Sequence, residues 1–374
     1  MHLATRLTRD LVAIPSVNPM GTGASGPLYS ERAVAEYVQA FLRTLGMDSE
    51  IWGEDETHPN LTAELQCGSP ATVLLEAHMD TVSHENMSID PFDPVILDGR
   101  LYGRGSCDTK ASLAAYLYAL HQVCTGSRRP SLNVILAAVH DEEYTFGGAR
   151  ELLRRGVAAD FAVAGEPTGL DIVYAHKGVC RFFVTTRGAA AHAAVPWLGS
   201  NAIHRMSEVL SSLAACADAL ALRPHPHLGP ATLNVGRILG GDTVNTVPSW
   251  CRIEVDRRLL PGESFSDVRQ GLAELLASRT DVTIEDAYLD VPAVYTDPTA
   301  TPCRQLLAAC RGAGFEPTFA TAHYATDASI LSTAGMATLV FGPGSVEVAH
   351  GARECVPVAD IEAASLAITE LISS

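Results

Sequence analysis

The chain has 374 residues, of which 47% are hydrophobic, and a formal net charge of -17 at pH 7. This length is enough for one large or two medium domains with a packed core. The 43 acidic residues outnumber the 26 basic ones. This balance argues against nucleic acid or a membrane surface as a partner, because both attract clustered cations. It is compatible with carboxylates that gather around metal ions.

Cysteine usage and the N-terminus bear on the location of the protein. The nine cysteines are scattered without a C-x-x-C pair, and their odd number fits a disulfide framework poorly. Free thiols in a reducing compartment are the simpler interpretation. The stretch MHLATRLTRDLVAIP has no long apolar core and no A-x-A-like cleavage site. No apolar run reaches the roughly 20 residues that span a bilayer. The sequence therefore predicts a cytoplasmic protein.

The first part of the chain alternates helices and strands. Apolar residues recur at helical spacing from Val34 to Leu45, and Gly46 follows as the expected C-cap. Residues 110–124 predict a buried crossover helix. Short, almost wholly apolar runs suit strands buried on both faces of a parallel sheet; they lie at 73–77, 132–139 and 160–165. This pattern predicts α/β architecture.

The pattern changes after residue 178. Strands and helices then follow in the order β-α-β-β-α-β over about 110 residues, the split βαβ pattern of a small α+β sandwich. From about residue 292 the α/β character returns, with helices near 302–313 and 358–372. We therefore expect a catalytic domain of residues 1–178 and 292–374, with a mostly parallel sheet and helices on both faces. Residues 179–291 form an inserted sandwich domain in this interpretation.

Histidines and carboxylates stand at the ends of the predicted strands, where open α/β folds place their sites. In LLEAHMDTV, His78 and Asp80 are two residues apart and therefore point to the same face of a strand. The carboxylate could then orient an imidazole that binds a metal. Asp108 follows the glycines of LYGRGSCDTK at the start of the predicted helix. Taken alone, an H-x-D is more often a polar strand end, and such an aspartate more often an N-cap.

Three further candidates follow later strands. AAVHDEE ends in Asp141, Glu142 and Glu143, which is a costly cluster unless cations or water take up the charge. A solvated loop explains it equally well. Glu166 ends the strand of AVAGEPT, and His350 follows a glycine-rich loop, where a histidine is more often a packing residue. Together the candidates suit two divalent ions that share one carboxylate, with zinc favoured and cobalt or manganese as alternatives.

Several motifs occur in one order over nearly the whole chain: LVAIPSVNP, LLEAHMDTV, LYGRGSCDTK, DEE, GEPT, GAAAHAA, RRLLPGE, GPGS and AH. In this respect the sequence resembles the di-zinc amidohydrolases and metallopeptidases that include acetylornithine deacetylase, succinyl-diaminopimelate desuccinylase, aminoacylase and carboxypeptidase G. The match is specific for the family and much less so for the substrate. The stretch HYATDAS at 323–329 looks closer to acetylornithine deacetylase-like members than to desuccinylases.

The resemblance implies a ligand set by position. His78, Asp108 and Glu166 look like ligands of one metal ion. Asp108, Glu143 and His350 look like ligands of the other, with Asp108 bridging the two. The peptide bond that follows Asp108 is expected to be cis, as is common in the family.

The resemblance also implies roles in catalysis and substrate binding. Glu142 is similar to the general base that takes a proton from the water between the metals, and Asp80 would hold His78 in place. The inserted domain resembles a lid that often pairs with a second lid, so a homodimer is expected. His192 matches a lid histidine that reaches the partner subunit's active site and stabilises the oxyanion. Asn245 and Arg258 match substrate contacts, although Arg258 could instead form an ordinary salt bridge within the lid.

The resemblance also concerns the glycines of the GPGS loop, and the sequence departs from the family pattern at a few positions. Gly342 and Gly344 would let the loop backbone approach the substrate. Many relatives have glycines where this chain has Ala111 and Ser112, and alanines surround His192. These departures affect packing rather than ligands.

The sequence thus predicts a metal-dependent hydrolase that removes the acyl group of an N-acyl amino acid, as an acetylornithine deacetylase does. A dipeptidase or carboxypeptidase that uses the same two-metal centre on short peptides is the alternative. A further alternative is a binding protein that has kept the fold but lost turnover. The presence of all five candidate ligands and Glu142 argues against it. No G-x-S-x-G elbow occurs, which disfavours a serine hydrolase.

Overall fold

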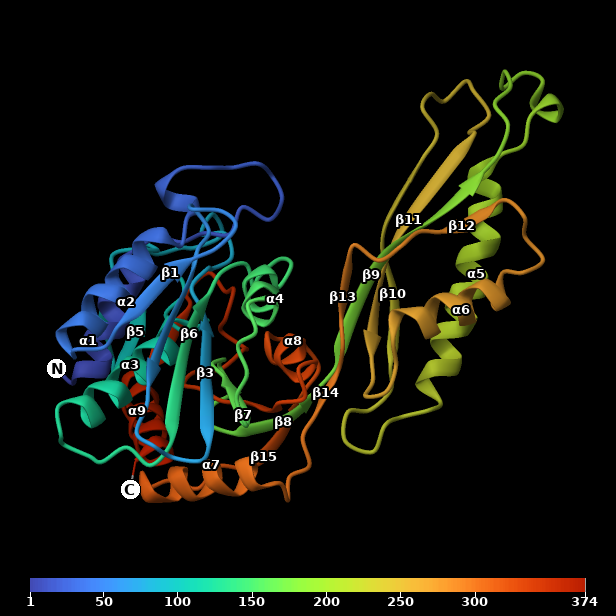
Figure 1. The fold of residues 1–374 in the computed structure, drawn as a ribbon. Coiled ribbons are helices and arrows are strands. Elements are labelled where there is room, and N and C mark those ends of the chain that lie inside the picture. The colour runs from blue at the N-terminus through green and yellow to red at the C-terminus, as the bar shows by residue number, and fades with distance from the viewer. Residues whose placement is uncertain (374) are drawn as a thin grey trace. The chain divides into compact units, whose positions relative to one another are not determined.

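The computed structural model describes residues 1–373 and divides the chain into two compact units (Figure 1). Unit 1 comprises Met1–Tyr174, Thr296–Ala320 and the C-terminal part from Thr326, whereas unit 2 comprises Ala175–Tyr295 and Thr321–Ala325. Unit 2 is thus inserted into unit 1. Within unit 1, the two residues that flank the long insertion are hydrogen-bonded, because Thr296 N donates to Tyr174 O at 2.8 Å.

Unit 1 carries most of the helices and a large sheet. Its helices are α1 (Leu3–Val12), α2 (Arg32–Thr44), α3 (Lys110–Cys124), α4 (Gly147–Arg154), α7 (Thr301–Gly312), α8 (Ala328–Ser332) and α9 (Val358–Ile372). The strands of the large sheet are β1 (Ser49–Trp52), β2 (Asn60–Leu65), β3 (Thr72–His78), β6 (Asn133–Val139), β7 (Phe161–Ala164), β8 (Ile172–His176), β15 (Phe319–Ala322) and β16 (Ala337–Val340). A small sheet contains β4 (Val95–Leu97), β5 (Arg100–Tyr102) and β17 (Cys355–Pro357).

The large sheet has the strand order β1-β2-β6-β3-β7-β16-β8, and β15 pairs with β8. Its central strands β6, β3, β7 and β16 run parallel, while the pairs β1–β2, β2–β6 and β16–β8 are antiparallel. Every residue of β6 is buried, as expected for a parallel strand covered on both faces. The predicted mostly parallel sheet is confirmed, with antiparallel strands added towards its edges.

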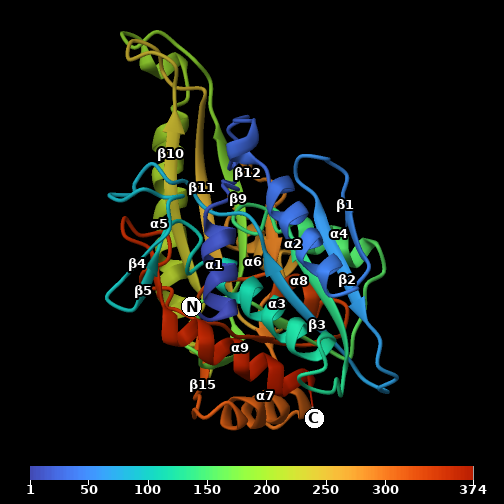
Figure 2. The same cartoon turned by 90° about the vertical axis from the view of Figure 1, so that its left-hand side faces the viewer.

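Helices cover both faces of this sheet (Figures 1 and 2). On one face α3 packs against β3, α1 and α9, and it is buried along almost its whole length, which explains why its sequence has no polar side. On the other face Leu152 of α4 and Leu331 of α8 join a core cluster with Leu74, Ala137 and Ala162 of the strands. The crossover helix predicted at 110–124 is confirmed, because α3 has the same bounds.

Unit 2 contains an antiparallel sheet and two helices, α5 (Ala202–Ala221) and α6 (Phe265–Leu275). Its strands are β9 (Gly178–Arg187), β10 (Thr232–Gly240), β11 (Trp250–Leu259), β12 (Val282–Ile284) and β13 (Leu289–Val291), and β14 (Val294–Tyr295) pairs with the end of β8. The sheet order is β10-β11-β9-β12, with β13 also on β9. Phe182, Met206, Ile253 and Leu272 belong to the core that the sheet forms with α5 and α6.

The predicted β-α-β-β-α-β order of unit 2 is observed, but its last strand is interrupted. Glu285 N donates to Phe183 O, and Tyr288 N donates to Arg181 O. Ile284 pairs with Val184 and Leu289 with Arg181. The four residues between them therefore lie opposite two residues of β9, and the two extra residues form a bulge. The predicted continuous strand is consequently split into β12 and β13. Within residues 1–373, no helix combines the length and the apolar character that crossing a membrane requires.

A buried carboxyl–imidazole pair lies at the start of α2. Glu31 is fully buried, and its Oε2 lies 2.6 Å from Nδ1 of His58. Burial raises the pKa of Glu31 to about 7, and the hydrogen bond to Glu31 raises the pKa of His58. Both groups therefore bind protons more readily in the folded chain than in the unfolded one. Stability must then fall as the pH rises through this range.

We predict that Glu31→Gln makes the free energy of unfolding less dependent on pH. The wild type should lose stability between pH 5 and pH 8, and the variant should lose less, by up to about 3 kcal/mol. Urea denaturation at both pH values, with a chelator present, measures the difference. Glu36→Gln, on an exposed carboxylate of the same helix, is the control and should behave as the wild type. An equally steep loss in Glu31→Gln would contradict this role of the buried pair.

Candidate metal centre

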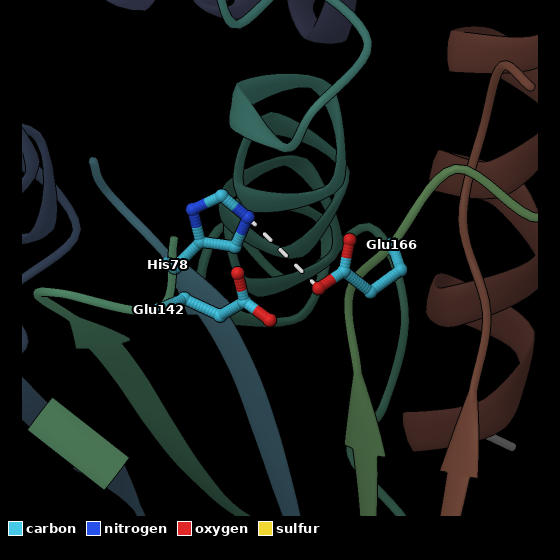
Figure 3. Close-up of side chains that lie close together, drawn as sticks. All are labelled: His78, Glu142 and Glu166. Carbon is cyan, nitrogen blue, oxygen red and sulfur yellow. Dashed lines mark ion pairs between the residues drawn. The ribbon is translucent and has the colours of Figure 1, made fainter. Parts of the chain in front are cut away.

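The register of the parallel strands gathers the candidate ligands of unit 1. Ala77 of β3 faces Ala138 of β6, and Glu76 of β3 faces Ala164 of β7, so the three strands end side by side. His78 ends β3, the 141–143 turn follows β6, and Glu166 follows β7. Figure 3 shows the side chains of His78, Glu142 and Glu166 converging from these strand ends. The sheet edge expected from the sequence is therefore where these groups meet.

Asp108 presents its two carboxylate oxygens to two different imidazoles. Oδ1 lies 3.0 Å from Nε2 of His78, and Oδ2 lies 3.2 Å from Nε2 of His350. Nε2 of His350 also lies 3.2 Å from Glu143, and Nε2 of His78 lies 3.9 Å from Glu166. Asp108 thus occupies the position between two groups of donors that a bridging ligand would need.

Two overlapping sets of donor atoms lie close enough to hold a cation. Atoms of His78, Asp108 and Glu143 lie within 4.8 Å of one another, and so do atoms of His78, Glu142 and Glu166. Glu142, which the resemblance implies to be the general base, is thus within ligand range in this arrangement. Imidazole nitrogens and carboxylate oxygens are donors that zinc and other first-row divalent ions accept, so the residues present fit a pair of such ions.

The electrostatics of the cluster also fit cations. Burial, and next the charge of Asp108, raises the pKa of Glu143 to about 7. Burial likewise raises the pKa values of Glu142 and Glu166 well above the ordinary range. The hydrogen bonds to Asp108 and Glu143 raise the pKa of His350 to about 10. Carboxylates crowded in this way need protons or metal ions to balance their charge.

Asp80 connects β3 to the turn that carries the two glutamates. Its carboxylate accepts hydrogen bonds from the backbone N–H groups of Glu142 and Glu143, both at 3.1 Å, and from the amide of Asn18 at 2.9 Å. The imidazole Nδ1 of His78 lies 3.0 Å from the backbone oxygen of Asp80 and 3.5 Å from its carboxylate. Asp80 therefore contacts His78 mainly through its carbonyl, and its carboxylate positions the 142–143 backbone.

The loops around Asp108 are tightly packed. The Asp108–Thr109 peptide bond is cis, as expected. A Cβ at Gly342 would lie 2.6 Å from the backbone oxygen of Glu166, and one at Gly344, whose φ is 83°, would lie 2.6 Å from Sγ of Cys107. Both glycines are thus required by contacts within the protein. The structure supplies this reason independently of the substrate approach that the resemblance implies.

The candidates in unit 2 fall into two places. His192 and Asn245 are exposed and lie in neighbouring loops, since Ala193 N donates to Asn245 O at 2.9 Å and His192 pairs with Thr246. Arg258 lies near the other end of β11, where its Nε donates to Asp256 at 2.8 Å. The structure therefore brings His192 and Asn245 together, and it places Arg258 in the salt bridge that was its alternative interpretation.

Several residues near the cluster were missed from the sequence. Glu76 and Asp327 are both buried, and their carboxyl groups lie close enough to affect each other's charge. Burial raises the pKa of Asp327 to about 7 and that of Glu76 well above its usual range. Glu76 could have been recognised from the sequence, because it lies two residues before His78 on β3 and therefore points to the same face of the strand. Asn18 lies in the SVNP motif, but its amide contacts with Asp80 and Asp141 depend on tertiary structure.

Comparison with known proteins identifies the family. The model of peptidase family M20/M25/M40 matches residues 74–374. The chain belongs to this family. The acetylornithine deacetylase of Proteus mirabilis is 32% identical over 98% of this chain and 95% of its own length, and that of Erwinia tasmaniensis is 31% identical over 95% and 93%.

Several solved structures share the fold. An M20 metallo-carboxypeptidase from Sulfolobus solfataricus superposes with a TM-score of 0.81 and 18% identity, covering 100% of this chain and 99% of its own. The YXEP protein of Bacillus subtilis, a dinuclear metal-binding M20 peptidase, has a TM-score of 0.70 and 16% identity, with 99% and 96% covered. Human carnosine dipeptidase 1 has a TM-score of 0.71 and 16% identity at the same coverage.

We predict that Glu143→Ala retains less than two metal ions per chain. Glu143 is buried beside Asp108 and His350, so its loss removes one of the donors of this group. The variant and the wild type would be stripped with a chelator, loaded with zinc, and analysed for metal content and for the zinc-induced rise in Tm. Glu64→Ala, on an exposed position of β2, is the matched control. Two tightly held ions in Glu143→Ala would refute the ligand role.

Proposed function

We propose that the chain is a two-metal deacylase that hydrolyses the amide bond of an N-acyl amino acid, with N-acetylornithine as the first candidate substrate. The observation that carries this proposal is the Asp108 carboxylate, which faces His78 with one oxygen and His350 with the other, beside Glu142. The identity of 32% over 98% of the chain to an acetylornithine deacetylase supports the choice of substrate class.

His78, Asp108, Glu143, Glu166 and His350 would hold the two ions, for which zinc suits the donor set best and cobalt or manganese are alternatives. When bound, two such ions supply positive charge that polarises the scissile carbonyl and lowers the pKa of a water. Glu142 would take the proton of that water and return it to the leaving amine. Asp80 supports this step because it accepts hydrogen bonds from the backbone N–H groups of Glu142 and Glu143.

Glu142→Gln tests the base directly. The substitution keeps the shape of the side chain but removes its ability to accept a proton, so we expect turnover to fall by a factor of at least about 100. Metal content should stay at two ions per chain. Turnover close to that of the wild type would refute the role as base, and loss of an ion would instead make Glu142 a ligand, as its proximity to His78 and Glu166 allows.

A dipeptidase or carboxypeptidase is the second candidate, because solved relatives with this fold include a metallo-carboxypeptidase and a dipeptidase. Amine release from N-acetylornithine, other acetyl- and succinyl-amino acids, and dipeptides, with zinc added, separates the two. We expect the acylated amino acids to be turned over fastest. Faster hydrolysis of dipeptides would instead indicate a peptidase that uses the same two-metal centre.

Unit 2 would act as a lid and as the surface of a homodimer. Apolar side chains are unusually exposed on it: Trp197 is 75% and Leu198 71% exposed, and Val244 is also fully accessible. The strand β10 ends the sheet order of this unit, and edge strands are common sites of pairing. His192 lies in the same region and would reach the partner's site, where it would stabilise the oxyanion. The lack of disulfides among the nine cysteines supports a cytoplasmic location.

We predict that His192→Ala and Glu142→Gln chains complement each other when mixed. Each variant alone should be nearly inactive. In a hybrid dimer, the His192→Ala chain keeps its own Glu142 and receives the partner's intact histidine. One of the two active sites of the hybrid dimer should therefore work. Random pairing should therefore restore about a quarter of the wild-type rate. Light scattering gives the oligomeric state, and no recovery in mixed dimers would refute action across the interface.

A further inference from the structure

We propose that Glu354, Arg104 and Asn86 form a clamp that positions the segments of Asp108 and His350, although none of the three would touch a metal ion itself. The proposal rests on the ligand roles given to Asp108 and His350 in the proposed function. It assigns the clamp a separate role, which is to set how tightly each of the two ions is held.

Glu354 holds the segment that carries Asp108. One carboxylate oxygen accepts hydrogen bonds from the backbone N–H groups of Cys107, at 2.9 Å, and of Asp108, at 3.1 Å. The other oxygen accepts a charge-assisted hydrogen bond from Nη1 of Arg104 at 2.6 Å. Glu354 and Arg104 are both fully buried. A buried, paired carboxylate of this kind has a fixed orientation, so the backbone that it binds is fixed as well.

Asn86 extends the clamp to His350. Its side-chain oxygen accepts a hydrogen bond from Nη2 of Arg104 at 2.7 Å, and its side-chain nitrogen donates to the backbone oxygen of His350 at 2.8 Å. His350 has a φ of 60°, which residues other than glycine rarely adopt. The hydrogen bond from Asn86 therefore restrains a backbone segment whose conformation is intrinsically unfavourable.

The small sheet explains why these distant parts of the chain meet. β17 pairs with β5, with Cys355 opposite Tyr102, and Gly103 N donates to the backbone oxygen of Glu354 at 3.2 Å. The residue before β17 is thereby placed beside the loop that follows β5. Glu354 reaches the Asp108 turn from this position, and Arg104 within the same loop completes the ion pair.

The two ends of the clamp should affect the ions differently. Glu354 acts on the segment of Asp108, which faces both His78 and His350, so both ions should depend on it. Asn86 acts on His350, whose imidazole lies beside Asp108 and Glu143. Only the ion shared by these residues should depend on Asn86.

The test measures zinc affinity of the full-length protein by competition with a chromophoric chelator, with Tm recorded in the metal-free state. We expect Asn86→Ala to lower the affinity for one of the two zinc ions about 10–100-fold, which is the usual effect of removing an outer partner of a ligand. The affinity for the other ion should not change. Glu354→Gln should weaken both. The matched control is Asn133→Ala, because Asn133 bridges Cys67 N and Ser69 O at the other end of β6. It should lower Tm without changing either affinity.

The outcomes separate the clamp from the proposed function. Wild-type protein that fails to bind two zinc ions would overturn the ligand assignment itself. Wild-type protein that binds two ions, together with Asn86→Ala and Glu354→Gln variants of unchanged affinity, would overturn the clamp alone. A drop in metal-free Tm without a change in affinity would show that the three residues serve folding only, and would also overturn the proposal.

Discussion

The carboxylate of Asp108, which would bridge the two ions, depends on contacts that hold many negative charges in one buried place. Its oxygens are directed at His78 and His350, while Glu142, Glu143 and Glu166 are buried around it. Burial and mutual repulsion oppose this arrangement. The large parallel sheet overcomes them because its apolar strands fix where each acidic residue emerges. The arrangement of the candidate ligands therefore depends on the hydrophobic core behind it.

Two buried carboxylates that would not contact the ions have similar tasks on opposite sides of the centre. Asp80 accepts hydrogen bonds from the 142–143 backbone and from Asn18, and so joins the ends of β3 and β6. Glu354 accepts hydrogen bonds from the 107–108 backbone and from Arg104. In both cases a carboxylate orients backbone N–H groups, and the backbone then orients the ligands. Such indirect support is a general feature of metal sites.

Much of this arrangement follows from the sequence, because strand ends and apolar runs are local signals. The runs at 73–77, 132–139 and 160–165 predicted the parallel strands, and the residues that follow them predicted where the candidate ligands converge. Glu354 and Asn86 carry no comparable signal, since their partners are distant in sequence and are chosen by the pairing of β17 with β5. The salt bridge of Arg258 to Asp256 and the bulge that splits the last strand of unit 2 likewise depend on neighbouring strands.

The hydrogen bond between Thr296 N and Tyr174 O has a consequence for how the chain could have been assembled. Seen from unit 1, the segment between these residues begins and ends at a single point, as a tight turn would. The entropic cost of closing so long a loop grows only slowly with its length. Unit 2 also folds on its own core, so most of this segment is not a flexible loop. An insertion at this point can therefore be lengthened, shortened or exchanged while the central strands that carry the candidate metal ligands remain paired. The candidate metal ligands and the inserted unit can then change independently within one chain.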